Sequence, residues 1–298
     1  MATFASVAMR CACIDIGSNT TRLLVAEPAP GGLAEVLQLR VFTRIGRSLD
    51  AAGAIPEATI AEVAEVVAAQ RDAARELGCA RLRVVATAAI RRAANGGQLV
   101  AALRERAGVD AEVLSGEEEA ALAFSGAART LHPQPTGTLA VVDVGGGSTE
   151  IAVGSLAGGV TWSRSFAIGS ASLHAACTGD PPAPADLARM RAKAREAFAG
   201  ADVPAADDAV AVGGSAASLP ALVGPILDAA ALERALGVLS GAPSAIVARV
   251  HGLAQERTQL LPAGILVLDA AAQALGGRPL RIGRGGLREG VVLELAAD

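Results

Sequence analysis

Two segments of the chain repeat an arrangement of residues that suits the handling of phosphate. Residues 13–20 (CIDIGSNT) and residues 141–150 (VVDVGGGSTE) each place an acid near the end of a short apolar run, before a glycine-containing polar turn. A second apolar run follows each turn, at residues 23–26 and 151–154. Such turns can offer backbone N–H groups to phosphate, and carboxylates can hold a cation between them. Two such units about half a chain apart indicate related domains facing each other across a phosphate-handling cleft.

The second copy carries the more specific signal. For the first copy, where Asp15 precedes the turn, an ordinary hairpin is an equal alternative because Asn and Gly are common turn residues. The glycine run at residues 145–147 is costly to order and adds nothing to a core, which favours close approach of the backbone to a ligand. Asp143 precedes it and Glu150 follows it. Hard oxygen ligands in a phosphate site point to Mg²⁺ or Mn²⁺.

A third acidic candidate stands at the start of a predicted helix that runs from residue 115 to about residue 129. Ser115 and Glu118 have the spacing of a capping box, which is a structural device that does not account for Glu119. The N–H groups of a helix start are expected to lower the pKa of Glu119. In phosphoryl transfer the placement of water matters more than the strength of the base, so Glu119 can still orient the attacking water.

Arginine suits phosphate binding because its guanidinium group can bind two oxygens at once. Arg91 is the candidate we favour, because it lies at the start of a helix that follows a strand. The glycine-rich segment at residues 212–215 fits a phosphate or nucleotide loop and a tight strand-to-helix turn equally well. The arginines near the turns are Arg22, Arg44, Arg47, Arg91 and Arg92.

The composition predicts a folded globular protein. The chain has 298 residues, of which 52% are hydrophobic and 19% charged, and its net charge is −4. This charge opposes nucleic-acid binding, so a polyanionic substrate would need a local arginine cluster. No apolar run is long enough to cross a membrane, and residues 1–10 do not resemble a secretory signal, so a cytoplasmic location is expected. Cys11 and Cys13 are expected to be buried thiols, although a metal pair is conceivable.

Strands alternate with helices in both halves, which predicts an α/β fold. The clearest linker is residues 133–137, and Gly96 with Gly97 is expected to break a helix. The expected strands are residues 12–16, 22–27, 35–43, 82–87, 111–114, a strand–turn–strand unit from 139, 161–168 and 210–212. The expected helices are residues 56–77, 88–95, 98–107, 115–129, 186–198 and most of 232–275.

Five motifs, in this order, resemble the exopolyphosphatase/guanosine pentaphosphatase (Ppx/GppA) family. They are residues 15–20 (DIGSNT), 86–95 (ATAAIRRAAN), 114–120 (LSGEEEA), 142–150 (VDVGGGSTE) and 286–290 (GLREG). The resemblance covers nearly the whole chain. It implies the actin-like ATPase (ribonuclease H-like) α/β fold, with two similar domains and an active-site cleft between them. The domains are expected at 1–129 and 130–298, and whether the last helix packs back on the first domain is left open.

The resemblance also implies Mg²⁺-dependent release of the terminal phosphate from inorganic polyphosphate. It assigns the general base to Glu119, metal binding to Asp143 and Glu150, and phosphate binding to Gly17, Ser18, Asn19, Thr20, Arg91, Gly145, Gly146 and Ser148. From the residues themselves we expect Asp15 to act on the metal through water, and Gly147 to bind phosphate with the rest of its turn. The family further leads us to expect a homodimer.

Three other activities fit the same residues. Hydrolysis of guanosine pentaphosphate is the nearest rival, because one site can act on a different phosphate end. A kinase or ATPase of the same fold would place residues 213–214 near an adenosine. A non-catalytic binder of polyphosphate or alarmone is opposed by the retained acids.

Two residues depart from the family pattern. Ser172 stands where the family usually has Arg, and Gln259 where it often has an acid, and both changes bear on substrate affinity and chain-length preference. The chain resembles a short two-domain form lacking a helical HD-like domain, from which we expect weaker processivity.

Overall fold

The computed structural model describes residues 9–49, 51–175 and 177–297. The prediction that residues 1–10 are not a secretory signal falls mostly on residues 1–8, which lie outside the described residues. Among the helices of the described part, none has the length and apolar character needed to cross a lipid bilayer.

The first sheet is built around the first hairpin. β1 (Cys11–Ile16), β2 (Thr21–Ala29) and β3 (Gly32–Val41) form an antiparallel meander, and β4 (Arg81–Ala86) pairs in parallel with the other side of β1. With β5 (Ala111–Val113) the strand order is β3-β2-β1-β4-β5. The predicted strand–turn–strand unit is therefore confirmed.

The second sheet repeats this order of connections. β6 (Leu139–Val144), β7 (Thr149–Ser155) and β8 (Gly159–Phe166) form an antiparallel meander, and β9 (Asp208–Val212) pairs in parallel with β6. The strand order is β10-β11-β9-β6-β7-β8. Its two short strands are β10 (Ile226–Leu227) and β11 (Leu280–Ile282). The repeated topology confirms an α/β fold made of two similar units.

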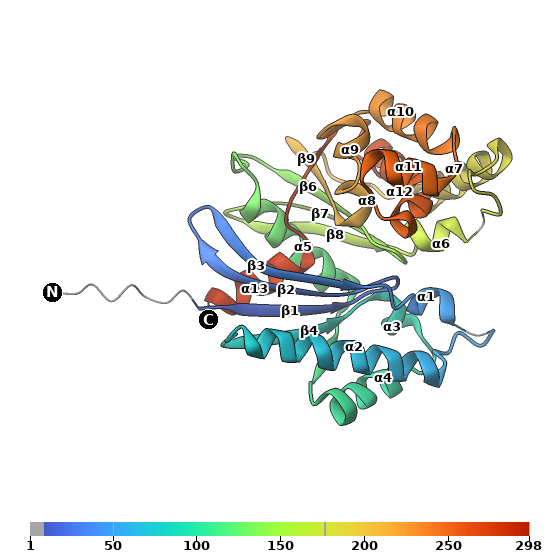
Figure 1. Ribbon diagram of the computed structural model, residues 1–298. Helices are drawn as coiled ribbons and strands as arrows, with labels where there is room; N and C mark the ends of the chain where they lie inside the picture. Colours follow the sequence, from blue (N-terminus) through green and yellow to red (C-terminus); the bar gives the residue numbers. More distant parts are fainter. Residues whose placement is uncertain (1–8, 50, 176, 298) are drawn as a thin grey trace.

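Long helices cover the outer face of each sheet (Figure 1). On the first sheet, α2 (Glu57–Glu76) packs its apolar stripe on β1 and β2. On the second, α7 (Pro184–Phe198) and α12 (Gln255–Ala274) share one apolar core with β6 and β7. The remaining outer helices are α4 (Gly96–Ala102), the π-helical turn η1 (Leu103–Ala107), α10 (Ala229–Ser240) and α11 (Ser244–His251). The short helices are α1 (Ile45–Ser48), α3 (Ala88–Arg92), α6 (Ser170–His174), α8 (Gly213–Ala216) and α9 (Pro220–Val223).

Two helices lie between the sheets, and each covers a different one (Figure 1). α5 (Gly116–Thr130) packs Phe124 against strands of the second sheet. α13 (Leu287–Ala297), near the end of the chain, packs Val291 on β1 of the first sheet. The two helices touch through backbone, because a Cβ added to Gly290 would lie 2.0 Å from the carbonyl oxygen of Leu122. The last helix therefore does pack back on the first sheet.

A break does separate the two expected helices, but it falls at residues 93–95, just before the glycine pair that was expected to cause it. Gly96 is the first residue of α4, where a Cβ would lie 2.3 Å from the carbonyl oxygen of Ile90. The glycine thus allows α3 and α4 to pack closely.

Cys11 and Cys13 are buried free thiols, as predicted. Among the described residues, no group of three or more histidine, cysteine or acidic side chains could hold a metal.

Candidate functional site

The two hairpins place their polar residues in the same register. Asp15 lies directly across from Arg22, and Asp143 lies directly across from Glu150. Each turn is closed in the same way: the Gly17 N–H donates to the Thr20 carbonyl at 3.0 Å, as Gly145 does to Ser148 at 3.0 Å. Directly paired residues point to the same face of a sheet. The repeated sequence pattern therefore brings four charged side chains to one side of their strands.

The glycine run of the second turn lets the two turns meet. A Cβ on Gly146 would lie 3.2 Å from Cβ of Asn19, and a Cβ on Gly147 would lie 2.4 Å from Oγ of Ser18. Arg92, at the end of α3, donates from Nη2 to the Gly147 carbonyl at 2.9 Å. The glycines were predicted to admit a ligand, and in this structure they also admit the opposite hairpin. The turns from the two halves thus form one wall.

A cavity of about 320 Å³ opens between the two halves beside these turns. It brings together nearly all of the predicted site residues, although they come from three separate motifs. Those lining it are Asp15, Gly17, Ser18, Asn19, Thr20, Glu119, Asp143, Gly145, Gly146, Gly147, Ser148 and Glu150. Arg91 is the predicted residue that does not line it.

Arg91 instead forms an ion pair with Glu119 and donates to the carbonyl of Leu114. Glu119 is positioned by the start of α5, where the predicted capping box is present: Glu118 N–H donates to Ser115 Oγ at 3.1 Å, and Ser115 N–H donates to Glu118. The side chain of Glu119 is 5% exposed. Arg91 therefore acts in this structure on the candidate base itself.

The pKa of Glu119 is raised to about 8, whereas the sequence led us to expect a lowered value. Burial is the largest cause and the negative charge of Glu150 is the next, while Arg91 opposes both. Any lowering of the pKa by the helix start is outweighed, because burial of Glu119 disfavours the charged carboxylate more strongly. Glu119 is thus poised to take up or release a proton near neutral pH.

The other acids of the cavity are also shifted toward their neutral forms. Burial, followed by the charges of Glu150 and Asp15, raises the pKa of Asp143 to about 7. Burial likewise raises the pKa of Glu150 and of Asp15, although Arg288 and Arg22 oppose the rise at Asp15. Closely placed acids that resist ionisation are the donor set that a divalent cation would satisfy.

The donor set suits a metal that retains other ligands. Asp15, Asp143 and Glu150 line one cavity, yet the described residues contain no cluster of three or more such groups that could hold a metal by itself. Mg²⁺ is commonly bound by one or two carboxylates, with phosphate oxygens and water completing the shell. The cross-strand pair of Asp143 and Glu150 fits that pattern, whereas Asp15 lies among arginines on the opposite hairpin.

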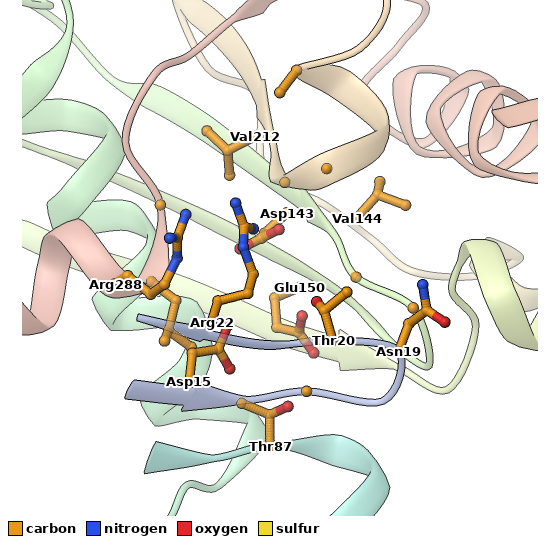
Figure 2. Close-up of a pocket in the computed structure, with 18 of the residues that line it drawn as sticks. Asp15, Asn19, Thr20, Arg22, Thr87, Asp143, Val144, Glu150, Val212 and Arg288 are labelled. Carbon is orange, nitrogen blue, oxygen red and sulfur yellow. The ribbon is translucent and has the colours of Figure 1, made fainter. Parts of the chain in front are cut away.

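The cavity also contains arginine nitrogens that lack a partner. Arg22 Nε and Arg288 Nη1 are buried and have no hydrogen bond within the described part of the chain. Figure 2 shows both side chains extending toward Asp143 and Val212. Burial, then the charge of Arg288, lowers the pKa of Arg22 to about 9, and burial, then Arg40, lowers that of Arg257 to about 10. The local arginine cluster that a polyanion would need is therefore present.

Sequence reasoning had named Arg22 as one candidate among five, but it did not find the rest of this cluster. Arg288 lies within the fifth motif, which was a signal that could have revealed it. Arg257 comes from α12, and its guanidinium covers Gly214, where a Cβ would lie 2.5 Å away. The glycine-rich segment of Gly213 and Gly214 is a strand-to-helix turn that lines the cavity. Other lining residues not predicted are Gln38, Arg40, Thr87, Ser170, Arg284 and Glu289.

The two departures from the family pattern do not line the cavity. Ser172 closes the first turn of α6, where its Oγ accepts from the Gly169 N–H at 2.9 Å. Gln259 is a partly buried residue of α12.

The comparisons with known proteins agree with one another. A model of the Ppx/GppA phosphatase family matches residues 24–298. Exopolyphosphatase 1 of Mycobacterium tuberculosis is 28% identical over 303 residues, which cover 96% of this chain and 88% of that protein. The guanosine-5'-triphosphate,3'-diphosphate pyrophosphatase of Aeromonas hydrophila is 28% identical over 96% of this chain, and the match spans 59% of its length. The crystal structure of the Aquifex aeolicus Ppx/GppA family member has a TM-score of 0.80 at 28% identity, covering 97% of this chain and 98% of that one.

The likeness to the Aquifex structure extends over both sheets, and the duplicated strand order is present in this chain. The predicted actin-like α/β fold of two similar halves is thereby confirmed. The chain belongs to the Ppx/GppA phosphatase family and is, as its five motifs predict, a hydrolase.

Proposed function

We propose that the protein is an exopolyphosphatase, which releases the terminal phosphate of inorganic polyphosphate with the help of Mg²⁺. The observation that carries this proposal is the pair of buried, unpartnered nitrogens on Arg22 and Arg288, in the same cavity as Glu119. A buried cationic nitrogen without a partner is unfavourable, and an anionic oxygen would satisfy it. The mycobacterial relative, named an exopolyphosphatase, supports the choice of anion.

In the proposed reaction, Glu119 orients a water molecule for in-line attack on the terminal phosphorus and accepts its proton. The bridging P–O bond breaks, the shortened polyphosphate leaves with the bonding electron pair, and orthophosphate is released. The pKa of about 8 suits this exchange, because a base works best when its pKa is near the working pH. Arg91 holds the carboxylate through their ion pair. Arg22 and Arg288 bind the phosphate oxygens. The terminal phosphate of the polyphosphate lies against the wall that the two hairpin turns form.

We propose that Asp143 and Glu150 hold Mg²⁺ or Mn²⁺, and that Asp15 contributes through water. When bound, the cation neutralises charge on the phosphate oxygens. The support is the direct cross-strand pairing of Asp143 with Glu150 and the resistance of both groups to ionisation without a cation.

Guanosine pentaphosphate is the second candidate substrate, and the Aeromonas relative, named for that chemistry, favours it. Both substrates present a terminal phosphate, so one site could serve either. Cytoplasmic location, a homodimer and weak processivity stay predictions.

The deciding experiment measures phosphate release from polyphosphate of defined lengths and from guanosine pentaphosphate, with Mg²⁺ and with EDTA, for wild type and Glu119→Gln. Metal-dependent release that collapses in the variant would establish the hydrolase, and the better substrate would name it. Binding of either compound without release would instead favour a sensor, and transfer of phosphate from ATP to an acceptor would favour a kinase.

A further inference from the structure

Ser165 lies at the edge of the candidate metal pair. Asp143, Glu150 and Ser165 are direct cross-strand neighbours on β6, β7 and β8, so they form one row across the second sheet. Ser165 Oγ donates a hydrogen bond to Glu150 Oε1 at 2.7 Å. Because Glu150 is only 5% exposed, bulk water cannot replace this hydroxyl easily. The hydrogen bond therefore holds Oε1 of the carboxylate, which the side chain of Ser148 also hydrogen-bonds.

Ser165 also contacts the helix that carries Glu119. A Cβ added to Gly116, the first residue of α5, would lie 2.5 Å from Cβ of Ser165 and 3.1 Å from its Oγ. The first residue of α5 thus packs directly against Ser165. Glu119 is in the first turn of the same helix. One small side chain touches both the carboxylate of Glu150 and the helix that positions Glu119.

Ser165 itself does not line the cavity, but the equivalent place in the first sheet does. There the row runs through Asp15, Arg22 and Arg40, and Arg40 lines the cavity. The matching position of Ser165 in the second row is a second reason to regard it as part of the site.

We propose that Ser165 is a positioning residue of the hydrolytic site, which holds Glu150 in the orientation needed to bind the catalytic cation beside Glu119. This inference rests on the proposed function. Groups that hold a metal-binding carboxylate by hydrogen bonds commonly contribute about 10–100-fold to metal affinity or activity.

The test compares Ser165→Ala with Ser163→Ala. Ser165→Ala removes the hydroxyl but keeps the Cβ that contacts Gly116, so the packing of α5 is retained. Ser163 lies on the same strand and the same face, paired with Ala152. For each variant, kcat, KM for polyphosphate and the half-saturating Mg²⁺ concentration are measured, and a crystal structure gives the orientation of Glu150.

We expect Ser165→Ala to raise the half-saturating Mg²⁺ concentration and lower kcat/KM by about tenfold or more, with Glu150 turned from its present orientation. Ser163→Ala should match wild type. Equal behaviour of the two variants, or an unmoved Glu150 in the Ser165→Ala crystal, would overturn the inference. If wild type hydrolyses neither substrate, the proposed function fails by itself, and the crystal comparison still decides whether Ser165 positions Glu150.

Discussion

Arg22 and Glu150 occupy the same place in the two matching hairpins, since each is the direct cross-strand partner of the acid that precedes the turn. In one hairpin that place carries a partly buried arginine, and in the other a buried acid whose pKa is raised by burial. The two halves therefore supply opposite charges to one cavity from the same backbone position. This arrangement suits a substrate that is itself an anion and arrives with a cation.

Arg22→Met should weaken substrate binding without destabilising the free protein. Arg22 Nε has no partner among the described residues, so the folded state loses no hydrogen bond there. Loss of a charge-assisted bond to phosphate should raise KM for polyphosphate by about tenfold or more. Steady-state kinetics and thermal unfolding without substrate check both parts. Arg164→Met, at an exposed position on β8, is the control and should leave KM unchanged.

Arg91→Gln should move the acidic limb of the pH–rate profile to higher pH. Glu119 works as a base only when ionised, and Arg91 lowers its pKa by a hydrogen bond and by its charge. Without Arg91 the pKa of Glu119 should rise above its value of about 8, so kcat/KM at pH 7 should fall while that at pH 9 recovers. A uniform loss at every pH would mean that Arg91 acts directly on the substrate instead.

The metal-free protein should lose stability as pH rises. The pKa of Glu119 is about 8 in the folded state, above its ordinary value of 4.5. Its contribution to stability is therefore complete below pH 4.5 and is lost as pH rises through 8. In EDTA, the Tm of Glu119→Gln relative to wild type should increase between pH 5 and pH 9. A constant difference in Tm across that range would contradict the raised pKa.

The site was predictable where local sequence decides the structure, and not where distant segments meet. The turns and the helix start that presents Glu119 follow from residues adjacent in the chain. Arg257 was missed because it belongs to α12, which carries none of the five motifs. Only the folded structure brings its guanidinium over Gly214. The direction of the Glu119 pKa was missed because a helix start is a local effect, whereas burial and Glu150 are contributed by the whole fold.

Ser115→Ala should reduce both stability and turnover. Its hydroxyl accepts the Glu118 N–H at the start of α5, and loss of such a cap destabilises by about 1 kcal/mol. Fraying of that turn should also displace Glu119 and lower kcat. Asp228→Ala removes the equivalent cap of α10, where Asp228 accepts from the Ala231 N–H at 2.7 Å, away from the cavity. That variant should lose similar stability in chemical denaturation and keep wild-type kcat.

Gly290→Ala should disrupt the crossing of α5 and α13. The added Cβ would lie 2.0 Å from the Leu122 carbonyl oxygen, a backbone atom that cannot move by itself. Overpacking of this kind destabilises by about 1–3 kcal/mol. Gly237→Ala, at an exposed helical position of α10 with no atom within 4 Å of the new Cβ, should instead stabilise by about 1 kcal/mol. Urea unfolding of both variants makes the comparison.

The position of α13 has a consequence for how the enzyme is made. Residues 287–297 cover the first sheet, although more than 250 residues separate them from its first hairpin, and they supply Arg288 to the cavity. A nascent chain that lacks this segment has an exposed apolar sheet and a cavity without one of its cations. Residues 287–297 must therefore pack on β1 before the first sheet is covered and before the cavity holds Arg288.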